Sequence, residues 1–304
     1  MGALYMVTIE QNAELSNYKQ KFKKKQRKLF LRRLFSNKLM VTGGLTIIFL
    51  MLVATLGPML VSFDPYETVA SDRLQKLNSK HLLGTDEFGR DLLARIVYGA
   101  QTTMGVGFTV TVISSIVGMI IGLYASYYRT LDHILMRICD GLMAIPAILL
   151  AIALMAALGP NTRNVVIALS IVFTPYIARV IRSSAIVVRE QTYIEAMKAQ
   201  GSSSFRIIWR HIMPNTISPL VVQATFIFAE SIIIEAALSF LGAGVPAPDP
   251  SWGNILYDGK IVIFNAWWMT VFPGIMIVLS VLGLNLLGDG LRDLIDPRTN
   301  QAKK

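Results

Sequence analysis

The sequence predicts an all-α membrane protein with six transmembrane helices. Its 304 residues are 53% hydrophobic and only 16% charged, and the mean hydropathy is +0.53, which lies outside the usual range of soluble domains. A helix needs about 20 mostly apolar residues to cross the hydrocarbon core of a bilayer. Runs of this length recur along the chain between short polar or basic segments, so composition and pattern indicate the same fold class.

Four of these runs contain no charged residue, namely 39–63, 96–128, 141–162 and 261–288. Two more are mostly apolar but charged, namely 164–188 with Arg179 and Arg182, and 217–242 with Glu230 and Glu235. Intramembrane charges face the bundle interior or water, and long side chains near helix ends can snorkel to the interface, as we expect of the two arginines. The expected transmembrane helices are 39–62, 103–127, 137–158, 164–188, 217–242 and 268–289.

The distribution of lysine and arginine orients these helices, because cytoplasmic flanks carry an excess of both. The net charge is +10, and residues 19–38 alone contain ten basic residues and no acid. When this tail is inside, the basic segments 129–137 and 189–210 and the carboxyl end also lie inside. Both termini are therefore expected in the cytoplasm of a multi-pass membrane protein. The tail is better suited to anionic lipid than to nucleic acid, which we do not expect as a partner.

The chain then divides into successive regions. These are a basic cytoplasmic tail at 1–38, a first transmembrane helix at 39–63, an extracytoplasmic segment at 64–101, a five-helix core at 102–290 and a cytoplasmic tail at 291–304. In the extracytoplasmic segment, Phe88, Leu92 and Ile96 have helical spacing, which predicts a short amphipathic helix within 86–100. That helix is either an interfacial connector or part of a docking surface.

The cytoplasmic loop 189–215 within the core is longer than most connections between helices. Good helix formers fill 195–200, Gly201 interrupts them, and the serines at 202–204 supply N-cap candidates for a second short helix. We expect Pro214 to end this second helix. The loop is thus predicted to be a helix–glycine–helix hook.

The second helix of the hook has two distinct faces. Its apolar face carries Phe205, Ile208, Trp209 and Ile212, and its other face carries Arg206 and Arg210. A short helix with aromatic anchors can seat itself in a groove of another protein. The same stripe could instead fold back onto the ends of its own transmembrane helices.

The spacing in this hook resembles the EAA loop of permease subunits in bacterial ABC importers. The resemblance rests on Glu195-Ala196, Gly201 and Pro214, while Met197 and Met213 replace the Ala and Leu that are usual there. Further motifs resemble the C-type permeases of the oligopeptide, dipeptide and nickel branch, and with the hook they cover roughly residues 40–298. These are Gly-Thr-Asp-Glu-Phe-Gly-Arg-Asp at 84–91, Glu-Ala-Ala-Leu-Ser-Phe-Leu-Gly at 235–242, Trp252-Gly253, and the segments 291–293 and 296–298.

The resemblance implies a permease fold of type I ABC importers and a set of partners. Such permeases pair with a homologous second permease, seat their loops on two ATP-binding subunits, and receive substrate from an extracytoplasmic solute-binding protein. ATP and Mg²⁺ would then be bound by the partner subunits. In this chain Glu195 and Gly201 would shape the hook, and the remaining contact residues implied by the motif are Ala196, Phe205, Arg206, Trp209, Arg210 and Pro214.

No nucleotide site or enzyme site is legible in this chain. Gly259-Lys260 is followed by Ile261 where a P-loop requires Ser or Thr. The three histidines are far apart in sequence, which argues against a metal site. Cys139 is the only cysteine, so no internal disulfide can form. We therefore expect a transporter subunit rather than an enzyme, without a cofactor of its own.

The intramembrane acids and the substrate stay open at this level. Glu230 and Glu235 are expected in the bundle interior or along the pathway, and Asp140 could pair with Arg137 on the third helix. Short peptides are the expected cargo by analogy, with nickel, a metal chelate or another small solute as the alternative. A secondary transporter is a more remote alternative, because no internal repeat of the two halves is evident.

Overall fold

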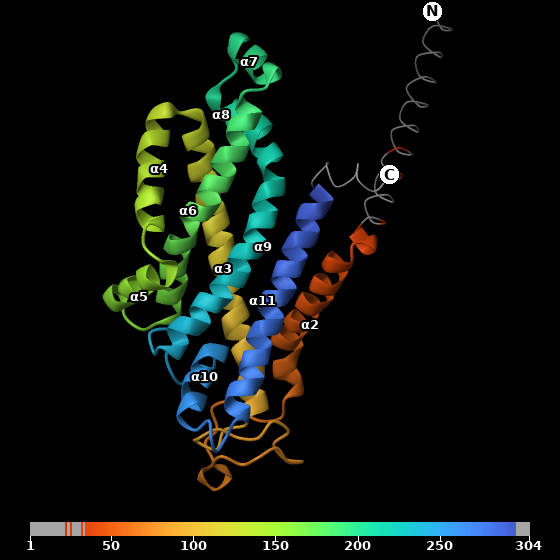
Figure 1. Cartoon of the computed structure of the whole chain (residues 1–304), viewed down its shortest axis with the longest axis vertical. Coiled ribbons are helices and arrows are strands. Elements are labelled where there is room, and N and C mark those ends of the chain that lie inside the picture. Colours follow the sequence, from red (N-terminus) through yellow and green to blue (C-terminus); the bar gives the residue numbers. More distant parts are fainter. Residues whose placement is uncertain (1–21, 23–24, 26–31, 33, 296–304) are drawn as a thin grey trace, which may run out of the picture.

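The computed structural model describes residues 22, 25, 32 and 34–295, which form helices joined by turns and one extended layer, without a β-strand among them. Five helices are long and apolar enough to span a membrane (Figure 1). They are α2 (Lys38–Leu60), α3 (Leu92–Tyr127), α6 (Thr162–Arg189), α9 (Met213–Phe240) and α11 (Trp268–Ile295). The tails expected at 1–38 and 291–304 lie mostly outside the described residues.

The sixth apolar segment is broken rather than straight. The helix expected at 137–158 is instead a pair, α4 (Arg129–Met143) and α5 (Ala147–Leu158), which meet at an angle of 93°. Pro146 stands immediately before α5. Proline lacks an amide donor and disfavours helical geometry in the residue before it, which explains the break at 144–146. The basic segment 129–137, which the sequence assigned to a connection before the third transmembrane helix, is itself helical, since α4 starts at Arg129.

The second transmembrane helix is longer than expected. It begins at Leu92, where the Asp91 side chain caps it by accepting a hydrogen bond from the amide of Ala94 at 2.8 Å, and it continues unbroken to Tyr127. The amphipathic helix expected within 86–100, leading into the second transmembrane helix, is helical only from Leu92. Its apolar spacing is the first part of α3 itself, and residues 86–90 form a turn.

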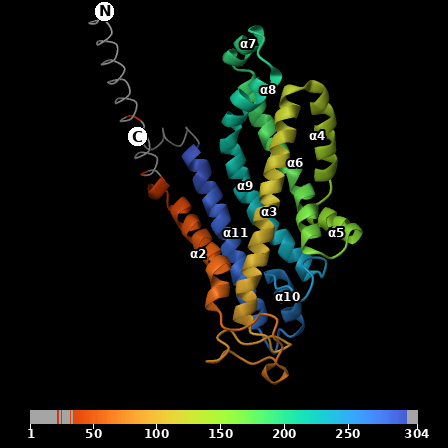
Figure 2. The ribbon, with the colours of Figure 1, turned by 180° about the vertical axis from the view of Figure 1, so that it is seen from behind.

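The bundle is organised around α3. Seen from behind, α3 runs through the middle, with α4 and α6 on one side and α11 and α2 on the other (Figure 2). Glycines allow the closest approach of α3 to α6, since a Cβ at Gly118 would lie 2.6 Å from that of Ile177, and one at Gly122 would lie 2.6 Å from the carbonyl oxygen of Ala178. This small-residue face packs two helices tightly, as such motifs do in membranes.

The two ends of the bundle differ in structure. One end carries the short helices α7 (Thr192–Ala199) and α8 (Ser204–Arg206), and α7 projects beyond the other helices (Figure 1). The other end is closed by the extended segment 61–91 with a 3₁₀ turn, η1 (Ala70–Asp72), and by the helix α10 (Trp252–Ile261). α10 was not predicted from the sequence, although Ser251 and Asn254 form a capping box at its start.

Candidate functional site

The projecting hook begins with α7 and turns at Gly201. The amide of Gly201 donates to the carbonyl of Lys198 at 3.0 Å, and the amide of Ser202 donates to that of Met197 at 3.0 Å, the bonding pattern of a Schellman motif. Gly201 has a φ of +76°, and a Cβ there would meet no atom within 4 Å. The position therefore requires glycine for its backbone conformation rather than for space.

The second arm of the hook is continuous with the fifth transmembrane helix. α8 leads into a π-helical turn, η2 (Ile207–Ile212), and then directly into α9. The amide of Met213 bonds to the carbonyl of Ile208 across this wider turn. The expectation that Pro214 ends the helix is wrong, because the proline sits in the first turn of α9, where a missing amide donor is tolerated after the π turn.

The apolar stripe of the hook divides between its two possible uses. Ile208 and Ile212 are buried in the main core, together with Ile194 of α7 and Ile207. Phe205, by contrast, is 67% exposed. The hook is thus held to the bundle by four isoleucines, while the aromatic side chain of Phe205 stays exposed.

The remaining residues singled out in the hook are mostly exposed. These are Glu195, Ala196, Arg206, Arg210 and Pro214, and none of the charged ones forms an ion pair among the described residues. Trp209 is half-buried against the core, and its indole nitrogen is buried without a hydrogen-bond partner among the described residues. A buried donor without an acceptor is costly. The surface of the hook therefore offers a free guanidinium pair and a free carboxylate, whereas the indole donor is enclosed.

The hook is also tied to the end of α3. Lys198 lies over the ring of Tyr127, 5.4 Å from its centroid, and the guanidinium of Arg189 donates to the carbonyl of Ser126. Because α3, α6 and α9 all meet the hook, a displacement of the hook would be passed to the centre of the bundle.

Two ion pairs join the broken segment to α6. Arg179 contacts Asp140 at 2.6 Å, and Arg182 contacts both carboxylate oxygens of Asp132, one of them at 2.7 Å. The pairing considered between Asp140 and Arg137 is wrong, because Asp140 instead reaches across to Arg179. The two arginines of α6 are thus partnered by α4 rather than simply extended toward an interface.

The two acidic residues of α9 have different surroundings. Glu230 is exposed, whereas Glu235 is fully buried. One oxygen of Glu235 accepts a hydrogen bond from Ser239 at 2.8 Å, and the other has no hydrogen-bond partner within the described part of the chain. Ser239 in turn accepts from the amide of Val245 at 3.0 Å. Glu235 therefore belongs to a buried polar cluster rather than to an open surface.

This cluster lies beside α10, where the motifs at 235–242 and 252–253 meet. The indole of Trp252 donates to the carbonyl of Ile96 at 3.0 Å, and its amide donates to the Thr103 hydroxyl at 3.2 Å. A Cβ at Gly253 would lie 2.6 Å from the carbonyl oxygen of Ala236. Trp252 and Gly253 thus allow α10 to pack against both α3 and α9.

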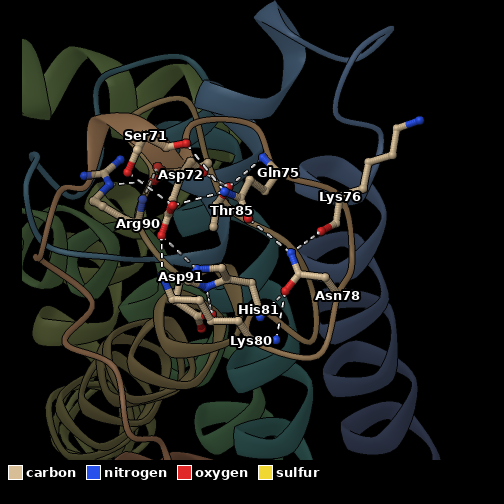
Figure 3. Close-up of polar contacts among 11 residues, drawn as sticks. Ser71, Asp72, Gln75, Lys76, Asn78, Lys80, His81, Thr85, Arg90 and Asp91 are labelled. Atoms are coloured by element: carbon tan, nitrogen blue, oxygen red, sulfur yellow. Dashed lines mark hydrogen bonds and ion pairs between the residues drawn. The ribbon is translucent and has the colours of Figure 1, made fainter.

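The motif at 84–91 organises the layer that closes the opposite end (Figure 3). His81 lies between two carboxylates, with Nδ1 at 2.9 Å from Asp91 and Nε2 at 3.3 Å from Asp72. Lys80 contacts Asp72 at 2.6 Å. This hydrogen-bonded ammonium is the main reason that the pKa of Asp72 lies below its usual range.

A second part of the same layer links it to α10. Asp86 accepts hydrogen bonds from the amides of Phe88 and Arg90 at 2.8 and 2.9 Å. Arg90 also contacts Asp258 of α10 at 3.6 Å, and burial raises the pKa of Asp258. The motif therefore makes internal contacts that cap α3 and fasten the outer layer, while the Phe88 side chain stays half exposed.

An all-helical membrane bundle with a helical hook at one end is the architecture of a transport permease. Residues 114–301 match the family described as the inner membrane component of binding-protein-dependent transport systems. Residues 25–78 match the N-terminal transmembrane domain of oligopeptide transport permease C. This chain therefore belongs to the permease family of ABC importers, in the oligopeptide and dipeptide branch.

Individual relatives support the same membership. The dipeptide transport system permease protein of Alkalihalophilus pseudofirmus is 46% identical over 268 residues, or 88% of each chain. A Brucella abortus chain whose name assigns it to a peptide transport system is 48% identical over 270 residues, or 89% of this chain and 91% of the relative. The di/tripeptide transport system permease protein of Pseudomonas aeruginosa is 38% identical, over 90% of this chain and 93% of the relative.

A solved structure supports the fold. The MetNI methionine ABC transporter in an inward-facing conformation contains a chain that superimposes with a TM-score of 0.56 and 21% identity. The match covers 66% of this chain and 97% of that one. The expected type I importer fold is confirmed.

Proposed function

We propose that this chain forms one half of the translocation pathway of an ATP-driven importer of short peptides. The observation that carries the proposal is the 46% identity, over 88% of both chains, to a permease named for dipeptide transport. The other half of the pathway would be a homologous second permease. Substrate would arrive from a solute-binding protein on the outer side of the bacterial cell membrane.

Energy would come from two separate ATP-binding subunits, which would hold the ATP and Mg²⁺. The hook supports this part of the proposal, because Phe205 is exposed on α8 and Arg206 and Arg210 are also exposed. Four buried isoleucines hold the same hook to the core. Movement of the ATP-binding subunits would therefore pull on α6 and α9 directly.

The proposed orientation places the hook and both termini in the cytoplasm. The basic segment 19–38 favours the inner side of the membrane. α2 begins and α11 ends toward the end of the bundle that carries the hook (Figure 1). The layer 61–91 and α10 would then face the solute-binding protein.

Purification from its own bacterium tests the proposal. A tagged chain should co-purify with a second permease and with two ATP-binding subunits per complex. The reconstituted complex with its solute-binding protein should import labelled dipeptides only when ATP is present. Uptake driven by an ion gradient without ATP would indicate a secondary transporter. ATP-driven uptake of nickel or a metal chelate in place of peptides would contradict the peptide assignment alone.

A further inference from the structure

A polar cavity of about 340 Å³ opens between α4 and α6. Its polar lining consists of Asp132, His133, Arg137, Asp140, Arg179 and Arg182. Both helices belong to segments that are apolar enough to cross the membrane. A strongly charged cavity in such a place calls for an explanation.

The depth of these charges indicates which way the cavity faces. Arg137 lies eight residues after the start of α4, roughly 12 Å along the helix, and Arg179 lies ten residues before the end of α6, roughly 15 Å along it. Charged groups inside a membrane face water or protein rather than lipid. This face of α4 and α6 is therefore suited to the wall of an aqueous pathway.

The charges in the cavity are not balanced. Asp132 forms an ion pair with Arg182, and Asp140 forms one with Arg179. Arg137 is exposed and has no ion-pair partner among the described residues, and His133 beside it is also exposed. The cavity thus keeps one unpaired guanidinium, whose planar set of donors matches a carboxylate.

We propose that Arg137 binds the terminal carboxylate of a peptide as it passes through the inner half of the pathway. This inference rests on the proposed import of peptides and adds a contact within this chain. The two ion pairs serve it indirectly, because they hold α4 against α6 and keep both cavity carboxylates from competing with the substrate. The same chemistry could attract the phosphate of an anionic lipid, which the experiment separates.

The test measures protection of a cysteine inside the cavity. Met136 also lines the cavity, so a Met136→Cys substitution in a Cys139→Ala background provides one labelling site in the complete, nucleotide-free complex. Its rate of reaction with a maleimide is measured in phosphatidylcholine nanodiscs with increasing dialanine or dialanine amide. In nanodiscs free peptide reaches both faces of the complex, so no solute-binding protein is added and none influences the comparison.

We expect dialanine to slow labelling and dialanine amide to slow it much less. Arg137→Gln should raise the half-protecting dialanine concentration about fivefold, the size expected for one exposed charged pair, and Arg137→Lys should raise it less. Arg129→Gln is the matched control, since it removes an exposed arginine from the first turn of the same helix and should change nothing.

Three results would overturn the inference. They are an absence of protection by dialanine, equal protection by the amide, or protection that survives Arg137→Gln. Labelling that slows only when phosphatidylglycerol replaces phosphatidylcholine would assign the cavity to a lipid headgroup and also overturn it. ATP-driven dipeptide uptake by the same complex is measured in parallel. If that uptake is present without protection, this inference alone has failed, whereas absent uptake means that the proposed function has failed.

Discussion

At the scale of single residues, Gly201 shows how backbone conformation can matter more than space. Its φ of +76° closes the first turn of the hook, and the surrounding space is open. A non-glycine residue in this region costs roughly 1–2 kcal/mol, with asparagine tolerated best. Position 201 therefore requires glycine for its backbone conformation alone.

Gly201→Val should sharply reduce ATP-driven uptake, whereas Gly201→Asn should retain most of it. The physical reason is that valine resists the left-handed conformation and would open the turn that presents the hook. Uptake per complex, with membrane insertion verified for each variant, checks this. Equal uptake by the valine and asparagine variants would mean that the turn does not depend on this φ.

A second residue-scale prediction concerns Asp72 and pH. Lys80 holds the pKa of Asp72 below its usual range. The stability that this carboxylate adds is present above the unfolded pKa, about 3.9, and is lost as the pH falls through the lower folded value. The wild-type protein in detergent should therefore melt at a higher temperature than Asp72→Asn at neutral pH, and the difference should shrink below about pH 4. A difference that stays constant down to pH 3 would contradict the assignment.

At the scale of elements, the broken segment α4–α5 is held by charge as well as by packing. Arg182 binds both oxygens of Asp132, and Cys139 is buried on the same helix. This cysteine is the only one in the chain, so its reactivity reports on the position of α4 without an introduced cysteine.

Removing the Asp132 carboxylate should loosen α4. We expect Asp132→Asn to increase the rate at which a membrane-permeant maleimide labels Cys139, by about two- to fivefold for a partly exposed ion pair. The exchanged pair Asp132→Arg with Arg182→Asp should restore slow labelling, and Arg129→Gln should leave it unchanged. If Asp132→Asn labels as slowly as the wild type, the ion pair does not hold the helix.

The two glutamates of α9 allow another element-scale prediction. Glu235 lies in the buried cluster beneath α10, whereas Glu230 is exposed. Glu235→Ala should lower the melting temperature markedly, because it leaves a cavity and removes the Ser239 contact. Glu230→Ala should change it little. Comparable losses in the two variants would show that burial does not distinguish these residues.

The elements also show where prediction from sequence reached its limit. Apolar runs located the helices well, because length in a bilayer is a strong constraint, and α6 at Thr162–Arg189 nearly matches the expected 164–188. The break at Pro146 was missed because the charge-free run 141–162 continues across it without interruption. The continuation through Pro214 was missed because a π turn leaves no clear pattern in the sequence.

The candidate hook was located correctly, but its internal packing was not predictable. Helical spacing placed Phe205, Ile208 and Ile212 on one stripe, while the π turn sends Ile207 and Ile208 together into the core and leaves Phe205 outside. Spacing alone could not decide between docking and self-packing, because the stripe is divided: Ile208 and Ile212 pack on the core, and Phe205 stays exposed. The pairing of Asp132 with Arg182, fifty residues apart, required the tertiary fold.

At the scale of the whole molecule, the fold links three features. The layer 61–91 closes one end, the core of α3, α6 and α9 crosses the membrane, and the hook projects from the other end (Figure 1). The family to which the chain belongs consists of the membrane components of transport systems. Under the proposed function, its contribution to transport depends on how the hook conveys motion generated by the ATP-binding subunits.

The most direct test of that dependence is the amount of ATP-binding subunit that co-purifies with this chain. We predict that the ATP-binding subunit co-purifies with the wild-type chain. Phe205→Asp in the hook should lower its recovery about tenfold or more, as for loss of a central aromatic anchor. Leu82→Asp, in the layer 61–91 where the side chain is 62% exposed, should leave the recovery unchanged. Recovery of no ATP-binding subunit with the wild type, or equal recovery with both variants, would contradict the account.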